Sequence, residues 1–552
     1  MPKDPWFKHW PEGVPQSIEY PKAPLQSFLE ESARNHPNHT AILYYGNKIT
    51  FDELNSLSDR FATILSGLGV SRGDRVALFL PNVPQFVFCF YGALKAGAIV
   101  VPCNPLYKER ELEHQLRDSE SKVVVALDLL YPVVKNIRER LDLTVITTSV
   151  KDYLPGLKKL LAPLKGVRKK TFPDTLDLVD LLKRHEPGPL KVEVDPVNDV
   201  AVLQYTGGTT GISKGAMLTH YNLVSNALMA INWLPIREAE DVHVAVLPFF
   251  HIYGLTTAMN APVMTSTTMI LLPRFDTKSV LQAIEKNKAT VFCGVPTMYV
   301  ALLDDPDTPT HDISTLRGCI SGAAPLPVAV MNQFNELMSG NLVEGYGLTE
   351  ASPLTHGNPL DDIRKVKAGS IGIPVSDTKA KIVDLEKGTK KLPIGEVGEL
   401  AVKGPQVMLG YWNKPEETKQ VFKRGWLLTG DIAKMDKDGY FYIVDRKKDM
   451  IDAAGYKVWP RDVEEALYEH PSVKEAAVIG VPDPYRGETV KAFIVPKAEA
   501  AGKISEQEII DFCKERIAAF KVPKQIEFRE ELPKTLVGKV LRRVLREEEA
   551  SE

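Results

Sequence analysis

The stretch DVAVLQYTGGTTGISKGAM, residues 199–217, joins a short apolar run to a loop rich in glycine and hydroxyl side chains. Its first eight residues are mostly β-branched, aromatic or aliphatic, which predicts a buried strand. In the loop, Gly207, Gly208 and Gly211 let backbone amides approach an anion closely, and the threonine hydroxyls add donors. Lys214 adds a positive charge. The stretch therefore predicts an anion-binding loop at the end of a buried strand.

The spacing of this loop differs from that of a Walker A motif. Lys214 precedes a glycine, and the G-x-x-x-x-G-K-[ST] order is absent. Taken alone, the loop also fits a flexible turn without a ligand. The density of glycine and threonine and the adjacent lysine favour phosphate binding, but they do not identify a reaction.

Apolar runs that resemble strands alternate with helical patterns along most of the chain. Buried strands are predicted at 74–80, 122–128, 199–206 and 290–296. Helices are predicted at 29–37, 107–119 and 276–288, the last with Asp276 as its N-cap. This alternation predicts α/β layers with largely parallel sheets.

The C-terminal part of the chain has a different pattern. Strands punctuated by glycine and proline predict a β-rich subdomain at about 369–444. The charge run DRKKD at 445–449 follows, and beyond it come a helix at 460–470, strands at 473–481 and 491–497, and a helix at 505–519. We therefore expect an N-terminal domain over 1–447 and a small α+β domain over 448–552, although the charge run alone also fits a solvated turn.

The bulk composition excludes several classes of protein. A net charge of −3 over 552 residues and a pI near 6.5 provide no general attraction to nucleic acid. Five scattered cysteines without CxxC spacing argue for reduced thiols and against a disulfide framework or a zinc site. The most apolar stretch, 76–101, is interrupted by prolines and polar residues, so it reads as a strand, a turn and a buried helix. With no secretory signal pattern at the N-terminus, a cytoplasmic location is expected.

Further motifs follow the loop in a fixed order. They are PFFHIYG at 248–254, SGAAPL at 321–326, EGYGLTE at 344–350, GWLLTGD at 425–431, VDRKKD at 444–449 and PKTLVGK at 533–539. Together with the loop, this set resembles the adenylate-forming superfamily of acyl-CoA synthetases, adenylation domains and beetle luciferases. Within it, the segments 104–116, 403–412 and 445–451 are most similar to long-chain fatty acid–CoA ligases.

The resemblance implies a fold and a reaction. The fold is a large N-terminal domain of two layered α/β subdomains plus a β-rich subdomain, with a small mobile α+β domain at the C-terminus. The reaction is ATP-dependent activation of a medium- or long-chain fatty acid to an acyl-adenylate, followed by transfer to coenzyme A. ATP, Mg2+ and coenzyme A are the implied cofactor and co-substrates, and AMP and pyrophosphate are the implied products.

The resemblance also assigns the phosphate and metal contacts. The residues implied at the phosphates are Thr206, Gly207, Gly208, Thr209, Thr210, Gly211 and Lys214. Glu350 matches the magnesium-binding glutamate of the family, and Thr209 is implied as a second metal contact. Standing alone, Glu350 is typical of an acidic residue at a helix N-terminus.

The nucleoside contacts follow in the same way. Tyr346 is implied to stack on the face of adenine. The edges of the base are implied to be lined by Gly322, Ala323, Ala324 and Pro325, with Gly347, Thr349 and Tyr442 nearby. Asp431 matches the aspartate that accepts both ribose hydroxyls, and Arg446 matches an arginine that also reaches the ribose. Without the resemblance, Tyr346 reads as a core residue, Asp431 as a turn residue and Arg446 as a surface charge.

Two further residues are implied to act on the carboxylate. Lys539 in PKTLVGK matches the lysine that bridges the acid and the α-phosphate during adenylation, although its basic surroundings also fit a solvated face. His251 in PFFHIYG is assigned to substrate positioning rather than to general-base catalysis, since a carboxylate needs no deprotonation at neutral pH. A lone histidine between aromatics is otherwise more often a core residue.

Two half-reactions on one scaffold imply rotation of the C-terminal domain. Lys448 matches the hinge position, and Gly455 matches the glycine that lets pantetheine pass close to the backbone. Asp452 departs from the pattern, because several relatives have lysine there, which puts details of the second conformation in doubt.

Several alternatives stay open at this point. The enzyme alternatives are a ligase for an aryl or short-chain acid, a luciferase-like oxygenase and, from another class, a P-loop ATPase; a lipid-binding member of the fold without catalysis is the non-enzyme alternative. An acyl tunnel is expected near 257–263 and 343–345. The basic segment 157–170 fits either a peripheral membrane contact or an ordinary surface helix and loop, and a homodimer is left open.

Overall fold

The computed structural model describes residues 4–156, 158, 169–188, 192–206, 213–453, 456–483, 487–535 and 540–549. The chain divides into two compact units. The larger is formed by Trp6–Lys379 and Lys403–Val421, and the smaller by Ala380–Val402 and Phe422–Glu552 together with Met1–Pro5. Each unit thus draws on separate stretches of sequence.

The first sheet of the larger unit has seven strands within the described ranges, in the order β7-β6-β5-β3-β4-β8-β9. Its pairs are parallel except for the antiparallel pair β8 and β9. The strands are β3 Arg75–Phe79, β4 Ile99–Pro102, β5 Ser121–Leu127, β6 Thr144–Thr148, β7 Leu176–Asp177, β8 Val200–Thr206 and β9 Lys214–Thr219. Because helices cover both faces of such a sheet, its central strands are buried and rich in valine.

The second sheet of this unit has nine strands in the part of the chain that is described, in the order β16-β15-β14-β13-β12-β10-β11-β1-β2. The central strands are parallel, and β2, β15 and β16 pair antiparallel at the two ends. The strands are β1 Thr40–Tyr44, β2 Asn47–Thr50, β10 Val242–Ala245, β11 Thr268–Leu271, β12 Val291–Gly294, β13 Gly318–Ser321, β14 Asn341–Gly347, β15 Leu354–Gly357 and β16 Ile373–Pro374.

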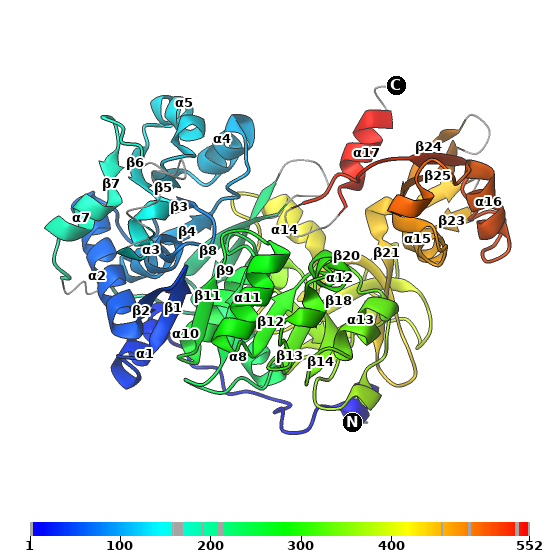
Figure 1. Cartoon of the computed structure of the whole chain (residues 1–552), viewed down its shortest axis with the longest axis horizontal. Helices are drawn as coiled ribbons and strands as arrows, with labels where there is room; N and C mark the ends of the chain where they lie inside the picture. The colour runs from blue at the N-terminus through cyan, green and yellow to red at the C-terminus, as the bar shows by residue number, and fades with distance from the viewer. Residues whose placement is uncertain are drawn as a thin grey trace. The chain divides into compact units, whose positions relative to one another are not determined.

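Helices accompany both sheets, and α11, α12 and α13 follow one another along the nine-stranded sheet (Figure 1). The helices of this unit are α1 Gln26–Asn35, α2 Phe51–Gly67, α3 Pro84–Lys95, α4 Glu109–Asp118, α5 Tyr131–Leu141, α7 Leu178–Arg184, α8 His220–Trp233, α9 Ile252–Gly254, α10 Ala261–Met264, α11 Thr277–Asn287, α12 Pro296–Asp304, α13 Val328–Asn335 and α14 Pro415–Val421. The apolar helix α3 is buried along its whole length and packs on α2, which explains why the stretch 76–101 is so hydrophobic.

The smaller unit contains two further sheets of five strands each among the residues described. One consists of β17 Lys379–Val383, β18 Gly398–Lys403, β19 Phe422–Lys423, β20 Trp426–Met435 and β21 Phe441–Arg446. The other consists of β22 Ile451–Ala453, β23 Tyr456–Val458, β24 Val473–Asp483, β25 Gly487–Pro496 and β26 Gln525–Phe528. Helices α15 Pro460–Tyr468, α16 Glu506–Lys514 and α17 Arg542–Glu549 belong to this unit.

The predicted α/β fold with layered sheets and a separate C-terminal part is confirmed. The four predicted strands correspond to β3, β5, β8 and β12, and Asp276 caps α11 by accepting a hydrogen bond from Ser279 N at 2.9 Å. The helix expected at 505–519 ends earlier, at Lys514. There the carbonyl of Cys513 accepts from both Arg516 N and Ile517 N, at 3.0 and 2.9 Å, which closes a turn.

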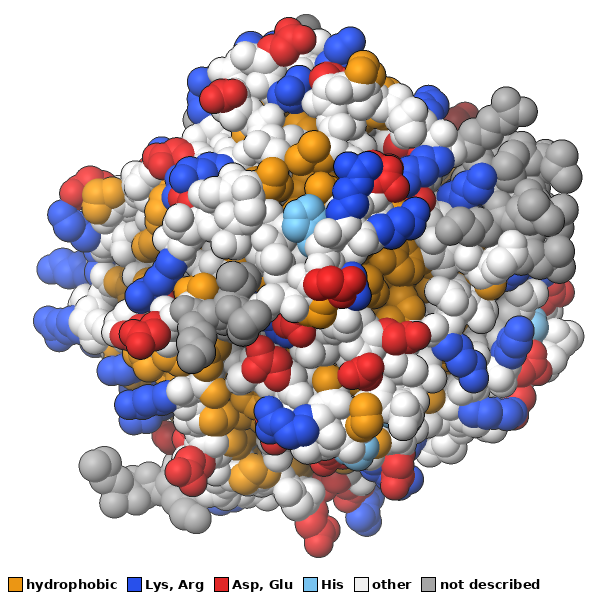
Figure 2. Space-filling model, turned by 90° about the vertical axis from the view of Figure 1, so that its left-hand side faces the viewer, with side chains coloured by type: hydrophobic (Ala, Val, Ile, Leu, Met, Phe, Trp, Pro, Cys, Tyr) orange, Lys and Arg blue, Asp and Glu red, His pale blue; other side chains and the backbone are white. Residues whose placement is uncertain are grey.

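The described residues contain no helix long and apolar enough to cross a membrane. Of the basic segment 157–170, only Lys158, Lys169 and Lys170 are described, so its predicted membrane contact mostly lies outside the described residues. Lys169 is paired with Asp152 and Asp177 at 3.1 and 2.7 Å. On the face drawn in Figure 2, basic and acidic side chains are interspersed, and neither sign forms a continuous patch.

Candidate active site

The phosphate loop connects two antiparallel strands of the seven-stranded sheet. Thr206, the last residue of β8, pairs in register with Lys214, the first residue of β9. The predicted anion-binding residues Gly207, Gly208, Thr209, Thr210 and Gly211 lie outside the described residues, so their contacts stay predictions. The structure thus brings the two ends of the loop side by side.

Helix α4 holds both arms of this loop. The Tyr205 hydroxyl donates to Asp118 Oδ2 at 2.6 Å, and His114 Nε2 lies 3.1 Å from the carbonyl oxygen of Ser213. Burial, followed by the neighbouring Asp118 carboxylate, raises the pKa of Tyr205, which keeps the hydroxyl protonated as a donor. His114 and Asp118 are four residues apart, so they share one face of α4.

A second segment lies along β9 on its open side. Met217 N donates to Gly410 O at 2.9 Å, Leu409 N to Met217 O at 3.0 Å, and Trp412 N to Gly215 O at 2.8 Å. This short ladder places Tyr411 opposite Ala216. The segment 409–412 therefore acts as an added strand beside the arm of the loop that begins at Lys214.

Tyr411 connects the two predicted phosphate-site groups of the larger unit. Its hydroxyl donates to Glu350 Oε1 at 2.7 Å, and Lys214 Nζ lies 5.4 Å from the centre of its ring. Glu350 lies on a short 3-10 helix, Thr349–Ala351, and its carbonyl oxygen accepts from Met408 N at 2.9 Å. The sequence identified Lys214 and Glu350 but missed Tyr411, whose only signal was its place in the quoted segment 403–412.

Two buried amide side chains hold the PFFHIYG motif and the residues just before it. Asn82 donates to the carbonyls of Ala245 and Leu247 at 3.0 and 2.8 Å and accepts from Phe249 N at 2.9 Å. Gln204, on the strand that enters the phosphate loop, donates to Phe250 O at 2.7 Å. Neither residue was singled out from the sequence, because a lone asparagine or glutamine in an apolar stretch carries no motif.

His251 caps the short helix α9. Its Nδ1 accepts a hydrogen bond from Tyr253 N at 3.2 Å, so that nitrogen carries no proton and the other ring nitrogen does in the neutral form. The imidazole is half-buried, whereas Phe249 and Tyr253 are buried beside it. The partial exposure of His251 therefore contradicts the alternative of a core histidine.

Tyr253 also connects this motif to SGAAPL. Its hydroxyl donates to Ile320 O at 2.9 Å, and a Cβ at Gly322 would stand 3.1 Å from its ring. Gly322 N in turn donates to Gly294 O at 3.1 Å. Beyond it, Ala323 has a positive φ of 67°, and Ala323, Ala324 and Pro325 are half-buried or exposed. Two motifs distant in sequence therefore meet at the ends of β12 and β13.

Tyr346 lies near the end of β14, half-buried rather than in the core. Its ring is edge-on to that of His356 on the paired strand β15, with centroids 5.9 Å apart. Burial lowers the pKa of His356 to about 3, so this imidazole is neutral. Gly347 follows, where a Cβ would stand 2.3 Å from the carbonyl oxygen of Pro353, so no larger residue fits without backbone movement.

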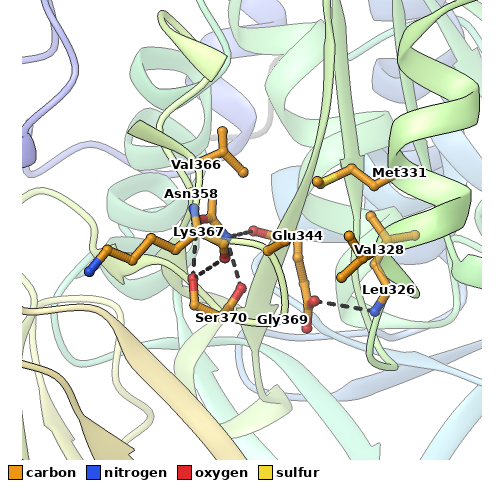
Figure 3. Close-up of a pocket in the computed structure, with 10 residues that line it drawn as sticks. Leu326, Val328, Met331, Glu344, Asn358, Val366, Lys367, Gly369 and Ser370 are labelled. Carbon is orange, nitrogen blue, oxygen red and sulfur yellow. Dashed lines mark hydrogen bonds between the residues drawn. The ribbon is translucent and has the colours of Figure 1, made fainter. Parts of the chain in front are cut away.

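A shallow pocket lies next to these elements (Figure 3). Leu326, Val328 and Met331 border it on one side, and the residues 366–370 border it on the other. The buried carboxylate of Glu344 accepts from Leu326 N at 3.2 Å. The strand β14 thus holds the end of SGAAPL through the Glu344 side chain, in addition to pairing with β13.

In the smaller unit, two predicted ribose-binding residues meet. Asp431 on β20 is opposite Arg446 on β21, and Asp431 Oδ1 lies 3.0 Å from Arg446 Nε. Asp431 is buried in the middle of a strand, so the alternative of a simple turn residue is wrong. Tyr442 is on the same strand as Arg446, and its hydroxyl lies 3.3 Å from Asp436 Oδ2.

The predicted hinge lies just after this strand. Lys448 is the middle residue of a 3-10 helix, Lys447–Asp449, and Lys447 Nζ is 2.9 Å from Glu399 Oε2. The predicted boundary between residues 447 and 448 falls inside the smaller compact unit, so the domain division stays a prediction. Gly455 and Lys539 lie outside the described residues, and their predicted roles also stay predictions.

The donor set suits a nucleotide–metal complex better than a metal bound by protein alone. The described residues contain no group of three or more His, Cys, Asp or Glu side chains able to hold a metal ion. Mg2+ commonly takes one or two carboxylates and completes its shell with phosphate oxygens and water. Glu350 fits this use, because its Oε2 makes no hydrogen bond to any described residue.

Comparisons with known proteins show the family of the chain. Residues 29–412 match the AMP-binding enzyme family, and residues 462–539 match the AMP-binding enzyme C-terminal domain. The long-chain-fatty-acid–CoA ligase of Bacillus subtilis (strain 168) is 48% identical over 553 residues, covering 99% of this chain and 98% of that protein. The feruloyl-CoA synthase of Amycolatopsis sp. is 36% identical, covering 94% of this chain and 97% of that protein.

The solved structures agree as well. An ATP-bound RpMatB-BxBclM chimera superposes with a TM-score of 0.85 and 33% identity, covering 96% of this chain and 99% of the chimera. The two family matches together cover most of the chain. The chain therefore belongs to the AMP-binding enzyme family.

Proposed function

We propose that this protein is a fatty acid–CoA ligase that forms an acyl-adenylate from ATP and then an acyl-CoA. The observation that carries the proposal is the near full-length similarity to a long-chain-fatty-acid–CoA ligase, at 48% identity over 99% of the chain. The arrangement of Lys214 and Glu350 around Tyr411 beside the phosphate loop supports ATP as the co-substrate.

In the first half-reaction, a carboxylate oxygen attacks the α-phosphorus of ATP, and the bond to pyrophosphate breaks. Negative charge moves onto the leaving group, so positioned cations contribute most of the catalysis. Lys214, at the end of the loop, neutralises negative charge on the phosphates, and Lys539 bridges the carboxylate and the α-phosphate. Glu350 Oε2 and Thr209 are the groups that would hold Mg2+, which would neutralise phosphate charge.

The carboxylate is positioned by the PFFHIYG turn. With Nδ1 accepting from Tyr253 N, the Nε2–H of His251 is the group able to donate to a carboxylate oxygen. Phe249 and Tyr253 are buried and exclude water from that side of the turn. His251 thereby orients the acid and takes no proton from it, in keeping with the ionised state of a carboxylic acid at neutral pH.

We assign the nucleoside contacts from the motifs that match the family. Tyr346 stacks on adenine, and the backbone of Gly322–Pro325 lines its edge. Asp431 accepts from the ribose hydroxyls, and Arg446 fixes the Asp431 carboxylate through Nε at 3.0 Å.

In the second half-reaction, the sulfur of coenzyme A attacks the acyl carbonyl, the thiol proton leaves, and the bond to AMP breaks. We assign the hinge to Lys448 and the pantetheine passage to Gly455. Lys539→Ala should lose most adenylation but keep thioester formation from supplied acyl-adenylate, and equal loss of both half-reactions would refute the role of Lys539. Lys448→Pro should impair coenzyme A transfer more than adenylation, a pattern that unchanged turnover would contradict.

The test of the proposed function is pyrophosphate release with acids of increasing chain length, with and without coenzyme A. The feruloyl-CoA synthase relative at 36% identity makes an aryl acid the second candidate, so ferulate belongs in the panel. Release of pyrophosphate and AMP with medium- or long-chain acids supports the proposal. Greater kcat/KM for ferulate than for every fatty acid, or release of ADP and phosphate, would overturn it.

A further inference from the structure

We propose that Tyr411 is a positioning residue that fixes the Glu350 carboxylate as a single-oxygen metal ligand and aligns it with Lys214. The inference rests on the proposed function, in which Glu350 holds Mg2+ and Lys214 serves the phosphates of ATP. It adds a residue that none of the motifs had assigned to the site.

The position of Tyr411 is set by the backbone. The ladder of residues 409–412 on β9 fixes Tyr411 between Gly410 and Trp412, whose backbone atoms bond Met217 and Gly215. The Trp412 indole also donates to Asp118 O at 3.1 Å. Since Asp118 accepts from Tyr205 on the other arm of the loop, Tyr411 is attached to the frame that holds both arms.

The hydroxyl of Tyr411 determines which oxygen of Glu350 faces a metal. Glu350 is an acceptor only when ionised, so the hydroxyl donates in the 2.7 Å bond to Oε1. Met408 N holds the carbonyl of Glu350 from the same segment, at 2.9 Å. Both the backbone and the carboxylate of Glu350 are therefore fixed by 408–411.

This geometry suits a small ion. With Oε1 occupied by the hydroxyl, Oε2 is the oxygen left to bind a metal, and the carboxylate binds through one oxygen. Mg2+ requires near-ideal octahedral geometry, which a single-oxygen carboxylate permits, whereas larger ions such as Ca2+ readily take both oxygens. Tyr411 thus favours Mg2+ or Mn2+ over Ca2+ at this carboxylate.

The ring of Tyr411 also contacts the ammonium group of Lys214. The ammonium lies 5.4 Å from the ring centre, within the range of a cation–π interaction. Tyr411 is only 9% exposed, so the ring is a fixed surface rather than a mobile side chain. Tyr411 thereby sets the distance between Lys214, which binds phosphate, and the Glu350 carboxylate, which binds the metal.

The test measures Mn2+ binding by electron paramagnetic resonance in the presence of a non-hydrolysable ATP analogue, and Mg2+ activation in the pyrophosphate assay. Tyr411→Phe keeps the ring and removes the hydroxyl, and a charge-assisted hydrogen bond accounts for roughly 10-fold in a binding constant. We expect the Mn2+ dissociation constant and the Mg2+ activation constant to rise about 10-fold, inhibition by Ca2+ to strengthen, and the KM for the acid to stay unchanged.

Two variants separate this role from simple structural support. Tyr131→Phe removes a hydroxyl bound to a different carboxylate, that of Asp174, and should leave the Mn2+ constant unchanged. Tyr411→Leu also removes the ring, and it should raise the KM for ATP at saturating Mg2+ beyond the value for Tyr411→Phe.

The outcomes are distinguishable from failure of the proposed function. If Glu350→Gln weakens Mn2+ binding while Tyr411→Phe leaves it within twofold of the wild type, the positioning role of Tyr411 is refuted and the metal role of Glu350 stands. If Glu350→Gln leaves Mn2+ binding unchanged, the metal role of Glu350 is wrong, and the inference fails with it. A change in Tyr411→Phe that Tyr131→Phe reproduces equally would also refute it.

Discussion

Replacing Asn82 by alanine should destabilise the larger unit and displace the turn that carries His251. Asn82 is 2% exposed and makes three hydrogen bonds to the segment 245–249. The carbonyl of Ala245 keeps a second donor, Leu272 N at 3.2 Å. Leu247 O and Phe249 N, however, have no other hydrogen-bond partner among the described residues and would be left buried and unpaired.

The expected magnitude follows from these two groups. An unpaired buried backbone group costs about 1–3 kcal/mol, so Asn82→Ala should lower the free energy of unfolding by about 2–6 kcal/mol. In a unit of several hundred residues, each kcal/mol lowers Tm by roughly 1 °C, which predicts a loss of roughly 2 to 6 °C. The KM for the fatty acid should rise more than kcat falls, because the position of His251 changes.

The assays are differential scanning calorimetry and initial rates of pyrophosphate release. Asn82→Asp preserves size but replaces the amide donor by an acceptor facing two carbonyls, so it should destabilise at least as much as Asn82→Ala. Asn232→Ala is the matched control, since its amide donates at 2.8 Å to Leu228 O within helix α8 and should cost about 0.5 kcal/mol or less. A Tm within 1 °C of the wild type for both Asn82 variants would refute the reasoning.

Three other measurements follow from the structure. Gly372→Ala should lower the free energy of unfolding by about 4 kcal/mol or more, because φ is 87° and a Cβ would stand 2.1 Å from the carbonyl carbon of Gly357. Gly369→Ala, with φ of 77° and no atom within 4 Å of its Cβ, should lower it by about 1 kcal/mol. Equal losses of Tm in the two variants would contradict this. Burial raises the pKa of Asp445 from its ordinary 3.8 to about 6, so the folded state binds this proton more tightly than the unfolded state, and the wild type loses stability as pH rises toward 6. Asp445→Asn does not titrate, so its free energy of unfolding should rise relative to the wild type by about 3 kcal/mol between pH 4 and pH 7, measured as a rise in Tm. A difference in Tm that does not change with pH would count against this. All five cysteines are free and buried, and burial raises the thiol pKa of each, so a thiol reagent should label the native protein only as it unfolds, and rapid labelling at pH 7 would disprove the burial.

Much of the fold could be predicted because the hydrophobic pattern of a single strand or helix can be recognised within its own sequence. The strands at β3, β5, β8 and β12 are short, valine-rich runs between turn residues, and the cap at Asp276 is a local signal. Such features depend on residues within one turn of a helix or one strand. The end of α16 was placed too late, because the turn at Cys513 carries neither glycine nor proline.

The site was predictable where it consists of motifs and unpredictable where it depends on pairing across long stretches of chain. The strand-like pairing of 409–412 with β9 joins segments almost two hundred residues apart, and no local pattern announces it. The same holds for Tyr411 with Glu350, for Asp118 with Tyr205, and for Asn82 with the turn before His251. Each is one polar side chain whose partner is chosen by the tertiary fold.

The interleaved course of the chain has a consequence for the order in which the protein is made. The chain leaves the larger unit after Lys379, returns for Lys403–Val421, and then leaves it again. A nascent chain that has reached residue 379 already contains Lys214 and Glu350 but lacks the hydroxyl of Tyr411 and the ladder of 409–412. No single cut in the gene separates the two units, and a fragment that ends after the larger sheets would fold its layers while leaving the metal carboxylate without its donor.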